Sequence, residues 1–413
     1  MKNLIQVGKT YKIILLLVIV VLQLNISAVA QDDIKPALKP NPSILEAINK
    51  LGDNESLLLE PTTIDGDLNE VAKKFQLHKT GPRTRDYCVK WVWMPDRKRA
   101  IFVGANHGVP HRLNDVWEYD LPSNTWYCLY GPDKSKPAND KKSEFSGWED
   151  TLIKNEVLQT QRGGPAILGH TWGQLTYDPE MKAMLWLNSW SMVPKDIVQH
   201  TKYPPFRAAP LWAYYPESGK WEFLQSKTIS GMRYGNSSTL DYISELNGDI
   251  WNVDGNMWLY TSKTNSWENI ASKKASDNKN AWPAWMHVSL YIPEKKMIVA
   301  VSPIDGKKPE RGGYTSVFSL KEKTWTRVTE GTDTPSSNNG FSTFVYDTVA
   351  KQCIFFDLRS GVLHSFDLEK KEWKKINPTG PAMVGKMGYY DEARNVFVLN
   401  QGSAVWLYRS KKE

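Results

Sequence analysis

Apolar and polar residues alternate in short stretches over most of the chain after residue 75, and turn-forming residues separate these stretches. Between residues 115 and 120 the alternation is regular; Pro122, Ser123 and Asn124 interrupt it, and it resumes at Trp126. This pattern predicts two antiparallel strands joined by a turn. The hairpin recurs, because five times an aromatic residue is followed seven positions later by Trp. The five pairs are Tyr119/Trp126, Tyr214/Trp221, Tyr260/Trp267, Phe318/Trp325 and Phe366/Trp373.

A second hairpin is predicted upstream of each of these pairs. Its turns are polar, as at residues 95–98 and 293–296, and apolar strands follow them, as at residues 100–103 and 297–301. Turns of this kind lie near Trp93, Tyr177, Asp241, Tyr291, Tyr346 and Tyr390. Two hairpins make one four-stranded unit, whose strands we call a to d in chain order. Repetition of such a unit at a period of roughly 45 to 60 residues predicts an all-β propeller.

The number of a-to-b turns predicts six blades. The last copy ends near Tyr408 without a strand d, so we expect an N-terminal strand to join the last blade and close the ring, which removes exposed edges. We assign this strand to residues 74–77, because they precede a Thr-Gly-Pro sequence much as residues 373–376 do. Seven blades are the alternative, if residues 127–168 contain another one.

The motif "Tyr-Asp, five residues, Trp" identifies a resemblance to a known family. It occurs as Tyr119-Asp120 followed by Trp126, and Phe366-Asp367 followed by Trp373 is a variant of it. Over roughly residues 75 to 409 the chain resembles the kelch-type propellers, which include the central domain of galactose oxidase and the bacterial sialic acid mutarotases. It departs from them where strand b ends, since Val103-Gly104 replaces the usual Gly-Gly pair. The resemblance implies a divergent kelch-like propeller.

The N-terminus has the features of an export signal. Three lysines precede the apolar run of residues 13–24, and Ala28-Val29-Ala30 matches a cleavage site. The run is shorter than the roughly 20 residues that span a bilayer, so we expect cleavage and no remaining membrane anchor. We therefore divide the chain into a signal peptide (1–30), a leader with a short helix (31–70) and one propeller domain (71–413). The predicted location is periplasmic or extracellular.

Charge and cysteine content exclude some classes of function. Removing the three signal-peptide lysines lowers the net charge from +7 to +4 (49 Lys and Arg against 45 Asp and Glu). This excess is compatible with an acidic glycan and too small to indicate a nucleic-acid partner. Cys88, Cys128 and Cys353 are an odd number of thiols. A Cys88–Cys128 bond would have to cross two strands, so we expect buried thiols.

The predicted topology places the long segments on one face. The d-to-a and b-to-c connections emerge there, whereas the opposite face has short charged turns such as residues 320–323. Long loops on a rigid scaffold commonly bind ligands. His and polar residues near the starts of strands a face the axial channel in this topology, and indole rings in loops can stack on sugars. The candidate ligand-binding residues are His107, His111, Trp148, Trp190, Trp282, Trp285, His287, Asn339 and Lys386. Each could instead only anchor its loop.

Three functions are compatible with these residues. The first is a binding module for a glycan or an extracellular protein. The second is a lyase acting on uronate-containing polysaccharides, as in propeller-fold polysaccharide lyases, with His170 or Tyr234 for proton transfer and Arg233 or Arg162 to neutralise the carboxylate. A sugar epimerase or mutarotase is the third. If the second holds, His170, Arg233 and Tyr234 must lie together.

Other chemistries lack their motifs. The copper oxidases that resemble galactose oxidase need a Tyr-His pair, and the chain contains no Tyr-His dipeptide. The spacing of His107 and His111 suits a metal on a helix, but Gly108 and Pro110 predict a loop, and a third ligand is not identifiable. No Gly-x-Ser-x-Gly elbow or phosphate-binding loop occurs. We therefore predict neither a metal site nor a cofactor, and the sequence leaves the oligomeric state open.

Overall fold

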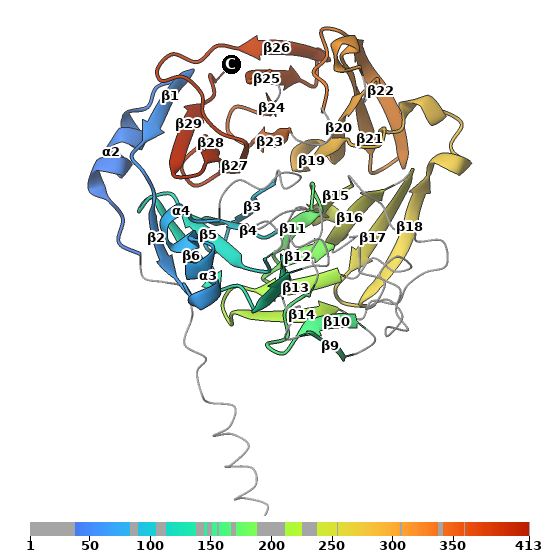
Figure 1. Ribbon diagram of the computed structural model, residues 1–413. Helices are drawn as coiled ribbons and strands as arrows, with labels where there is room; N and C mark the ends of the chain where they lie inside the picture. The colour runs from blue at the N-terminus through green and yellow to red at the C-terminus, as the bar shows by residue number, and fades with distance from the viewer. Residues whose placement is uncertain are drawn as a thin grey trace, which may run out of the picture.

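The protein is a six-bladed β-propeller, as predicted. A computed structural model describes residues 38–82, 90–104, 113–137, 144–146, 151–154, 157–166, 171–187, 211–224, 238–253, 255–305, 308–337, 342–358 and 360–412. Six sheets of four or five strands surround a central axis (Figure 1). The innermost strands of neighbouring sheets contact each other, and those of the first and last sheets do so too. The ring of innermost strands is therefore continuous.

Each sheet contains three or four consecutive strands, and the first of these is innermost. Sheets 1 to 3 contain β3 (Val92–Met94), β4 (Arg99–Phe102), β5 (Val116–Asp120) and β6 (Thr125–Tyr130); β11 (Leu175–Asp178), β12 (Ala183–Leu187), β13 (Leu211–Tyr215) and β14 (Lys220–Leu224); and β15 (Thr239–Ile243), β16 (Gly248–Val253), β17 (Asn256–Thr261) and β18 (Ser266–Ser272). Sheets 4 to 6 contain β19 (Val288–Ile292), β20 (Met297–Pro303), β21 (Gly313–Ser319) and β22 (Thr324–Gly331); β23 (Thr343–Asp347), β24 (Gln352–Asp357), β25 (Val362–Asp367) and β26 (Glu372–Ile376); and β27 (Met387–Asp391), β28 (Val396–Gln401) and β29 (Ala404–Arg409).

Short elements decorate this ring. The α-helices are α2 (Pro42–Lys50), α3 (Glu70–Lys74) and α4 (Leu77–Thr80), and the 3-10 helices are η1 (Ser244–Leu246), η2 (Lys273–Ala275), η3 (Lys279–Ala281), η4 (Pro293–Lys295) and η5 (Pro309–Arg311). Two small hairpins pair β7 (Ser135–Pro137) with β8 (Glu144–Ser146) and β9 (Thr151–Lys154) with β10 (Val157–Thr160). Beyond strand β6, the described part of residues 127–168 forms only these two hairpins. It therefore contains no seventh blade.

The aromatic pairs of the repeat explain how each blade packs. Residues seven positions apart become direct partners across the hairpin of strands c and d, as with Tyr119 and Trp126 or Phe366 and Trp373. The ring centroids of these two pairs lie 5.0 and 4.8 Å apart. Aromatic cross-strand pairs stabilise antiparallel sheets. The spacing of seven residues between the two aromatic positions is set by the length of the turn. It therefore indicates which residues pair across each hairpin.

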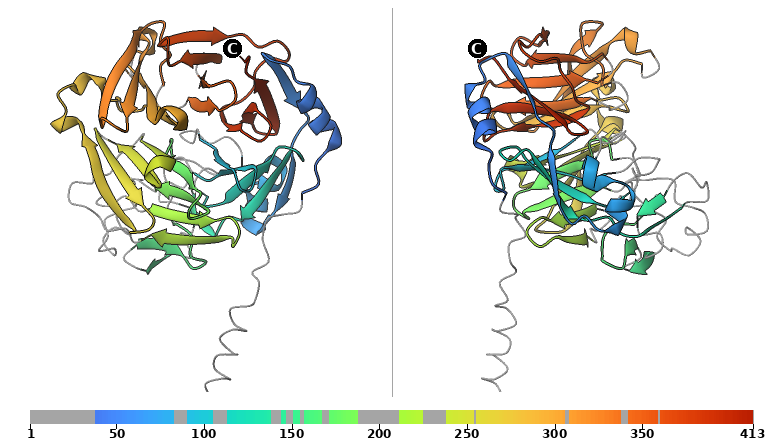
Figure 2. Two further views of the ribbon diagram at one scale, coloured as in Figure 1. Left: turned by 180° about the vertical axis from the view of Figure 1, so that it is seen from behind. Right: turned by 60° about the vertical axis from the view of Figure 1, so that its left-hand side comes forward.

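The N-terminal segment contributes strands to two sheets. Strand β1 (Glu55–Leu59) pairs with β29 in the last sheet, and β2 (Thr63–Gly66) pairs with β6 in the first. Figure 2 shows α2 beside β1 on the rim of the ring in both views. Ile48 of α2 and Leu59 of β1 belong to the core shared with the first and last sheets. Both strands lie within residues 31–70, the predicted leader.

The prediction that residues 74–77 supply the outer strand of the last sheet is wrong. Lys74 ends α3 and Leu77 begins α4. The side chain of Asn69 accepts a hydrogen bond from the Ala72 amide at 3.0 Å, which caps α3 at its N-terminus. Alternation over only four residues, with Phe75 and Leu77 apolar, does not distinguish strand from helix, and the Asn69 cap favours the helix that Lys74 ends.

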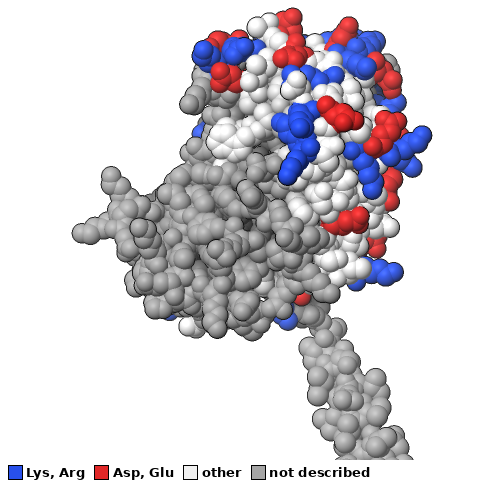
Figure 3. Space-filling view, turned by 90° about the vertical axis from the view of Figure 1, so that its right-hand side faces the viewer, with Lys and Arg blue, Asp and Glu red and all other residues white. Residues whose placement is uncertain are grey.

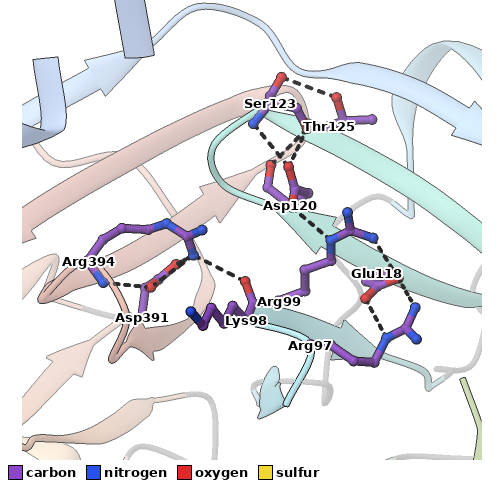
Figure 4. A network of polar contacts seen from close by, with 9 residues as sticks. All are labelled: Arg97, Lys98, Arg99, Glu118, Asp120, Ser123, Thr125, Asp391 and Arg394. Atoms are coloured by element: carbon purple, nitrogen blue, oxygen red, sulfur yellow. Dashed lines mark hydrogen bonds and ion pairs between the residues drawn. The ribbon is translucent and has the colours of Figure 1, made fainter. Parts of the chain in front are cut away.

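Buried ion pairs stabilise the first sheet on the short-turn face, and a hydrogen bond from Arg394 joins this sheet to the last one (Figure 4). Arg97 contacts both oxygens of Glu118 at 2.9 Å, and the Arg99 Nε lies 2.7 Å from Asp120 Oδ1. From the last sheet, Arg394 Nη1 donates to the Lys98 carbonyl at 3.1 Å. The Glu118 side chain is fully buried. The ion pairs neutralise charges that are buried within the first sheet, and the hydrogen bond from Arg394 to the Lys98 carbonyl links the two ends of the ring.

The surface distribution of charge and the burial of two thiols agree with what the sequence predicted. On the side of the ring drawn at the right of Figure 1, Lys and Arg side chains are interspersed with Asp and Glu over the described surface (Figure 3). Cys128 and Cys353 are each 1% exposed. Cys88 lies outside the described residues. Within the described residues, no helix has both the length and the apolar character that crossing a bilayer requires.

Candidate axial site

The innermost strands enclose a cavity of about 220 Å³ along the propeller axis. Strand residues of five sheets line it, together with Gly173, which precedes β11 of the second sheet. Lys90 and Gly173 lie at the end where the strands begin, and Glu392 lies at the other end. Aromatic rings form part of its wall: Trp91 and Trp93 both stack on Tyr389, with centroids 5.4 and 5.9 Å away. The cavity is thus aromatic along one side.

An ion pair lies at the end of the cavity where the strands begin. The Lys90 ammonium lies 2.7 Å from Asp241 Oδ1 and donates to the Leu240 carbonyl, also at 2.7 Å. Lys90 precedes β3 and bridges to Gly388 of the last sheet, whereas Asp241 lies on β15 of the third sheet. The side chains are 26% and 10% exposed. The pair therefore links distant parts of the ring in a partly desolvated place.

Hydroxyl groups extend this pair toward the fourth sheet. Ser289 Oγ lies 2.7 Å from Asp241 Oδ2 and 2.7 Å from Thr239 Oγ1. Because a carboxylate only accepts, Ser289 donates its proton to Asp241. Thr239 is then left to donate either to Ser289 or to His287 Nε2, which lies 3.4 Å away. We call Lys90, Asp241, Ser289, Thr239 and His287 the axial cluster.

His287 is held neutral within this cluster. Its Nδ1 lies 3.0 Å from the Ala284 carbonyl, which can only accept, so Nδ1 carries the proton and Nε2 is an acceptor. Burial lowers the pKa of His287 to about 4. At neutral pH the imidazole is uncharged, and the cluster contains one cation and one anion. Its net charge is zero.

Tyrosines recur at one position near the opposite end of the innermost strands, where Tyr346 and Tyr390 line the cavity. The penultimate residues of the innermost strands include Tyr177, Tyr346 and Tyr390, and each donates to an acid of the preceding sheet. Tyr177 donates to Asp96 and Tyr390 to Asp347, both at 2.8 Å, and Tyr346 donates to Glu294. Burial raises the pKa of all three phenols, so they stay protonated donors. These bonds connect neighbouring blades.

Among the predicted site residues, the structure places His287 in the axial cluster and the other described ones elsewhere. Trp282 is 2% exposed, and its carbonyl accepts from Tyr314 at 2.9 Å, so it anchors its segment. Trp285 is 62% exposed. Lys386 is half-buried and donates its backbone N–H to the Asn400 carbonyl.

Arg162 is engaged with two carboxylates. Its Nη1 lies 3.0 Å from Asp133 Oδ1, and its Nη2 lies 3.4 Å from Asp67 Oδ2. The guanidinium also stacks over Tyr130, 4.0 Å from the ring centroid. Through these contacts it ties the turn after β10 to the segments after β2 and β6. The arrangement fits an anchoring role better than neutralisation of a substrate carboxylate.

Eight predicted residues lie outside the described part of the chain. They are His107, His111, Trp148, His170, Trp190, Arg233, Tyr234 and Asn339. The proposed lyase grouping of His170, Arg233 and Tyr234 therefore stays a prediction. Across the described ranges, no group of three or more His, Cys, Asp and Glu residues could hold a metal ion.

The sequence analysis missed Lys90, Asp241 and Ser289. One signal was present for Asp241, because it places a charge in the middle of a predicted inner strand where Leu290 and Val345 stand in the fourth and fifth sheets. A charged residue in a buried strand usually has a partner. Nothing in the repeat indicates that this partner is Lys90, 151 residues away.

Comparison with known proteins shows only distant similarity. No protein-family model matches the chain, and no curated protein matches it. TolB from Acinetobacter baumannii superposes with a TM-score of 0.41 and 10% identity, covering 71% of this chain and 55% of TolB, so the chain spans about half of that protein. An auxiliary nutrient binding protein from Bacteroides thetaiotaomicron superposes with a TM-score of 0.47 and 11% identity, covering 86% of this chain and 76% of that protein.

Proposed function

We propose that the protein is a carbohydrate-binding module that holds one neutral sugar unit at the axial cluster. The observation that carries this proposal is the convergence of Lys90, Asp241 and Ser289 from three sheets on one small cavity. Each offers a donor or an acceptor that a sugar hydroxyl can use. A rigid scaffold that brings separate polar groups to an aromatic-walled cavity is the usual form of a small-molecule site.

The charge and the size of the cavity favour a small neutral ligand. The Lys90 and Asp241 charges cancel, so neither an anion nor a cation has an unbalanced partner there. A volume of about 220 Å³ lies below the roughly 300–1,000 Å³ of sites for drug-sized molecules. A single sugar ring suits this space, and Trp93 offers it an aromatic surface.

The cluster is better suited to binding than to turnover. With its pKa lowered to about 4, His287 cannot serve as a proton donor at neutral pH, and its Nδ1 proton is committed to a backbone carbonyl. Asp241 already accepts from Lys90 and Ser289. The lyase and the epimerase or mutarotase remain second proposals, whose residues are those of the long loops.

A kelch-type relationship and export of the chain also remain proposals. The aromatic-to-Trp hairpins in five sheets support the first. The charged and apolar segments before Gln31 support the second.

Calorimetry on the chain from Gln31 onward tests the binding proposal. A panel of neutral monosaccharides and their methyl glycosides is titrated into the wild type and into the Lys90→Met and Ser289→Ala variants. We expect at least one sugar to bind and both variants to weaken that binding tenfold or more. Lys321→Met, at an exposed turn of the fourth sheet, serves as the charge-matched control and should bind normally.

Two results would count against the proposal. One is that no neutral sugar binds; the other is that Lys90→Met and Ser289→Ala bind like the wild type. Incubation with polyuronates, followed by ultraviolet absorbance of an unsaturated product, tests the lyase alternative. A rising signal would replace the binding module with the lyase.

A further inference from the structure

A second, larger cavity lies on the short-turn face, where no function was predicted. It is a groove of about 780 Å³ over the fifth sheet. Its walls come from the a-to-b turns of sheets 4 and 5, the turn between β25 and β26, and Lys412 of the C-terminal segment. Tyr346 lines both this groove and the axial cavity. The volume lies within the range of typical ligand sites.

The charged lining of this groove is predominantly basic. It contains Lys295, Lys351, Lys370, Lys374 and Lys412 against Glu294, Asp367 and Glu369. Three of these lysines form ion pairs: Lys295 with Glu369, Lys351 with Glu294 at 3.2 Å, and Lys370 with Asp367 at 2.8 Å. Lys374 and Lys412 form no ion pair with any residue in the described part of the chain. The groove thus has an excess of two positive charges.

The two unbalanced lysines are held by ordered backbone. Lys374 lies on β26, opposite Ser365. The Lys412 amide donates to Asp53 at 3.3 Å, and the Gln352 side chain donates to the neighbouring Lys411 carbonyl, also at 3.3 Å. These contacts fix the C-terminal segment beside the fifth sheet. The positions from which both ammonium groups extend are therefore set before any ligand arrives.

The existing ion pairs can exchange partners at small cost. The side chains of Lys295 and Glu369 are 45% and 75% exposed, and pairs as exposed as this contribute little to stability. An incoming anion can therefore recruit Lys295 as well. Val349, which is 43% exposed, adds an apolar surface to the same groove. A ligand here meets several cations and an apolar contact.

We propose that this groove binds a carboxylated oligosaccharide, with its acid groups on Lys374 and Lys412 and the C–H face of a ring on Val349. A polyuronate combines regularly spaced carboxylates with apolar ring faces, and both features have partners in the lining. The site is separate from the axial cluster and does not depend on it. It gives the propeller a second carbohydrate contact at the opposite end of its axis.

The test uses the chain from Gln31 onward and a defined probe, tri-galacturonate. Binding is measured by calorimetry at low salt, beside the neutral galactose trimer of equal length and hexa-glutamate as an acidic peptide. We expect tri-galacturonate to bind to the wild type. Its affinity should fall tenfold or more in Lys374→Met/Lys412→Met, and it should also fall as the sodium chloride concentration rises. The neutral trimer should bind at least tenfold more weakly at this groove.

A control variant separates loss of binding at the groove from a general loss of positive charge. Lys321→Met/Lys323→Met removes the same charge from an exposed turn outside the groove and outside the axial cluster. This variant should bind tri-galacturonate like the wild type. Absence of tri-galacturonate binding, equal loss in the Lys321→Met/Lys323→Met control, or equal affinity for the neutral trimer would overturn the proposal. Tighter binding of hexa-glutamate would assign the groove to an acidic peptide instead.

Discussion

The Lys90 ammonium and the Asp241 carboxylate meet at 2.7 Å, although the two residues are 151 positions apart and belong to the first and third sheets. The pair exists only because the propeller closes and brings the starts of its inner strands around one axis. Its partly desolvated position gives it an energetic role as well as a place in the proposed sugar site.

Removing one partner of this pair should destabilise the protein. Asp241→Asn removes the negative charge opposite the Lys90 ammonium and places an NH2 donor at one of the two positions where the carboxylate accepts from Lys90 and Ser289. Loss of a hydrogen bond to a charged group costs about 1.5–3 kcal/mol. The free energy of unfolding in urea measures this change. In a double-mutant cycle with Lys90→Met, the combined loss should be smaller than the sum of the single losses. Strictly additive losses would show that the two side chains do not interact.

Glu118→Gln should be among the most destabilising single changes. Glu118 is fully buried and contacts Arg97 at 2.9 Å and Arg99 at 3.5 Å, so the amide leaves two buried guanidinium groups short of one negative charge (Figure 4). Breaking a buried pair in this way costs about 3–5 kcal/mol. Glu322→Gln at an exposed turn is the control, with a change of about 0.5 kcal/mol or less. Similar urea midpoints for the two variants would contradict this account.

His287 should make stability depend on pH. Its folded pKa of about 4 lies below the value of about 6.5 in an unfolded chain, so the unfolded state binds more protons between these values. The free energy of unfolding should therefore fall as pH drops from 6.5 to 4, by roughly 3 kcal/mol from this residue. In His287→Asn this part of the pH dependence should disappear.

Titration of Asp391 changes stability with pH in the direction opposite to His287, so the two contributions must be measured separately. Burial raises the pKa of Asp391 to about 6, so its contribution is present at low pH and is lost as pH rises through 6. The wild-type curve contains both contributions together with those of other groups whose pKa burial shifts, such as Asp249 and His364. The difference between the wild type and His287→Asn isolates the histidine, and an unchanged slope in that variant would refute the prediction.

The repeated tryptophans should differ in importance according to burial. Trp126 is fully buried against Tyr119, and truncation of such a side chain to Ala costs about 3–5 kcal/mol. Trp373 occupies the same position in the fifth sheet but is only half-buried, so Trp373→Ala should cost less. Thermal unfolding compares the two. If Trp126→Ala does not fold, Trp126→Phe against Trp373→Phe provides the same ranking.

The blade pattern was readable from the sequence because it depends on local rules. Tyr119 and Trp126 lie on one hairpin, so turn length and strand alternation are enough to make them partners. The six innermost strands could be located in the same way, because each lies next to one of the predicted turns. Residues 74–77 show the limit, since their short alternation suggested a strand, whereas Lys74 ends α3, which Asn69 caps, and Leu77 begins α4.

The sequence by itself determined that this chain folds into six repeated sheets, because hydrophobic periodicity and turn chemistry act within a few residues. Only the tertiary structure decided that strand β1 covers β29, that His287 faces Thr239, and that Lys90 pairs with Asp241. It also placed Lys374 and Lys412 in the lining of one groove. These relationships depend on how the ring closes, since contacts between residues far apart in sequence form only when the blades pack around a common axis.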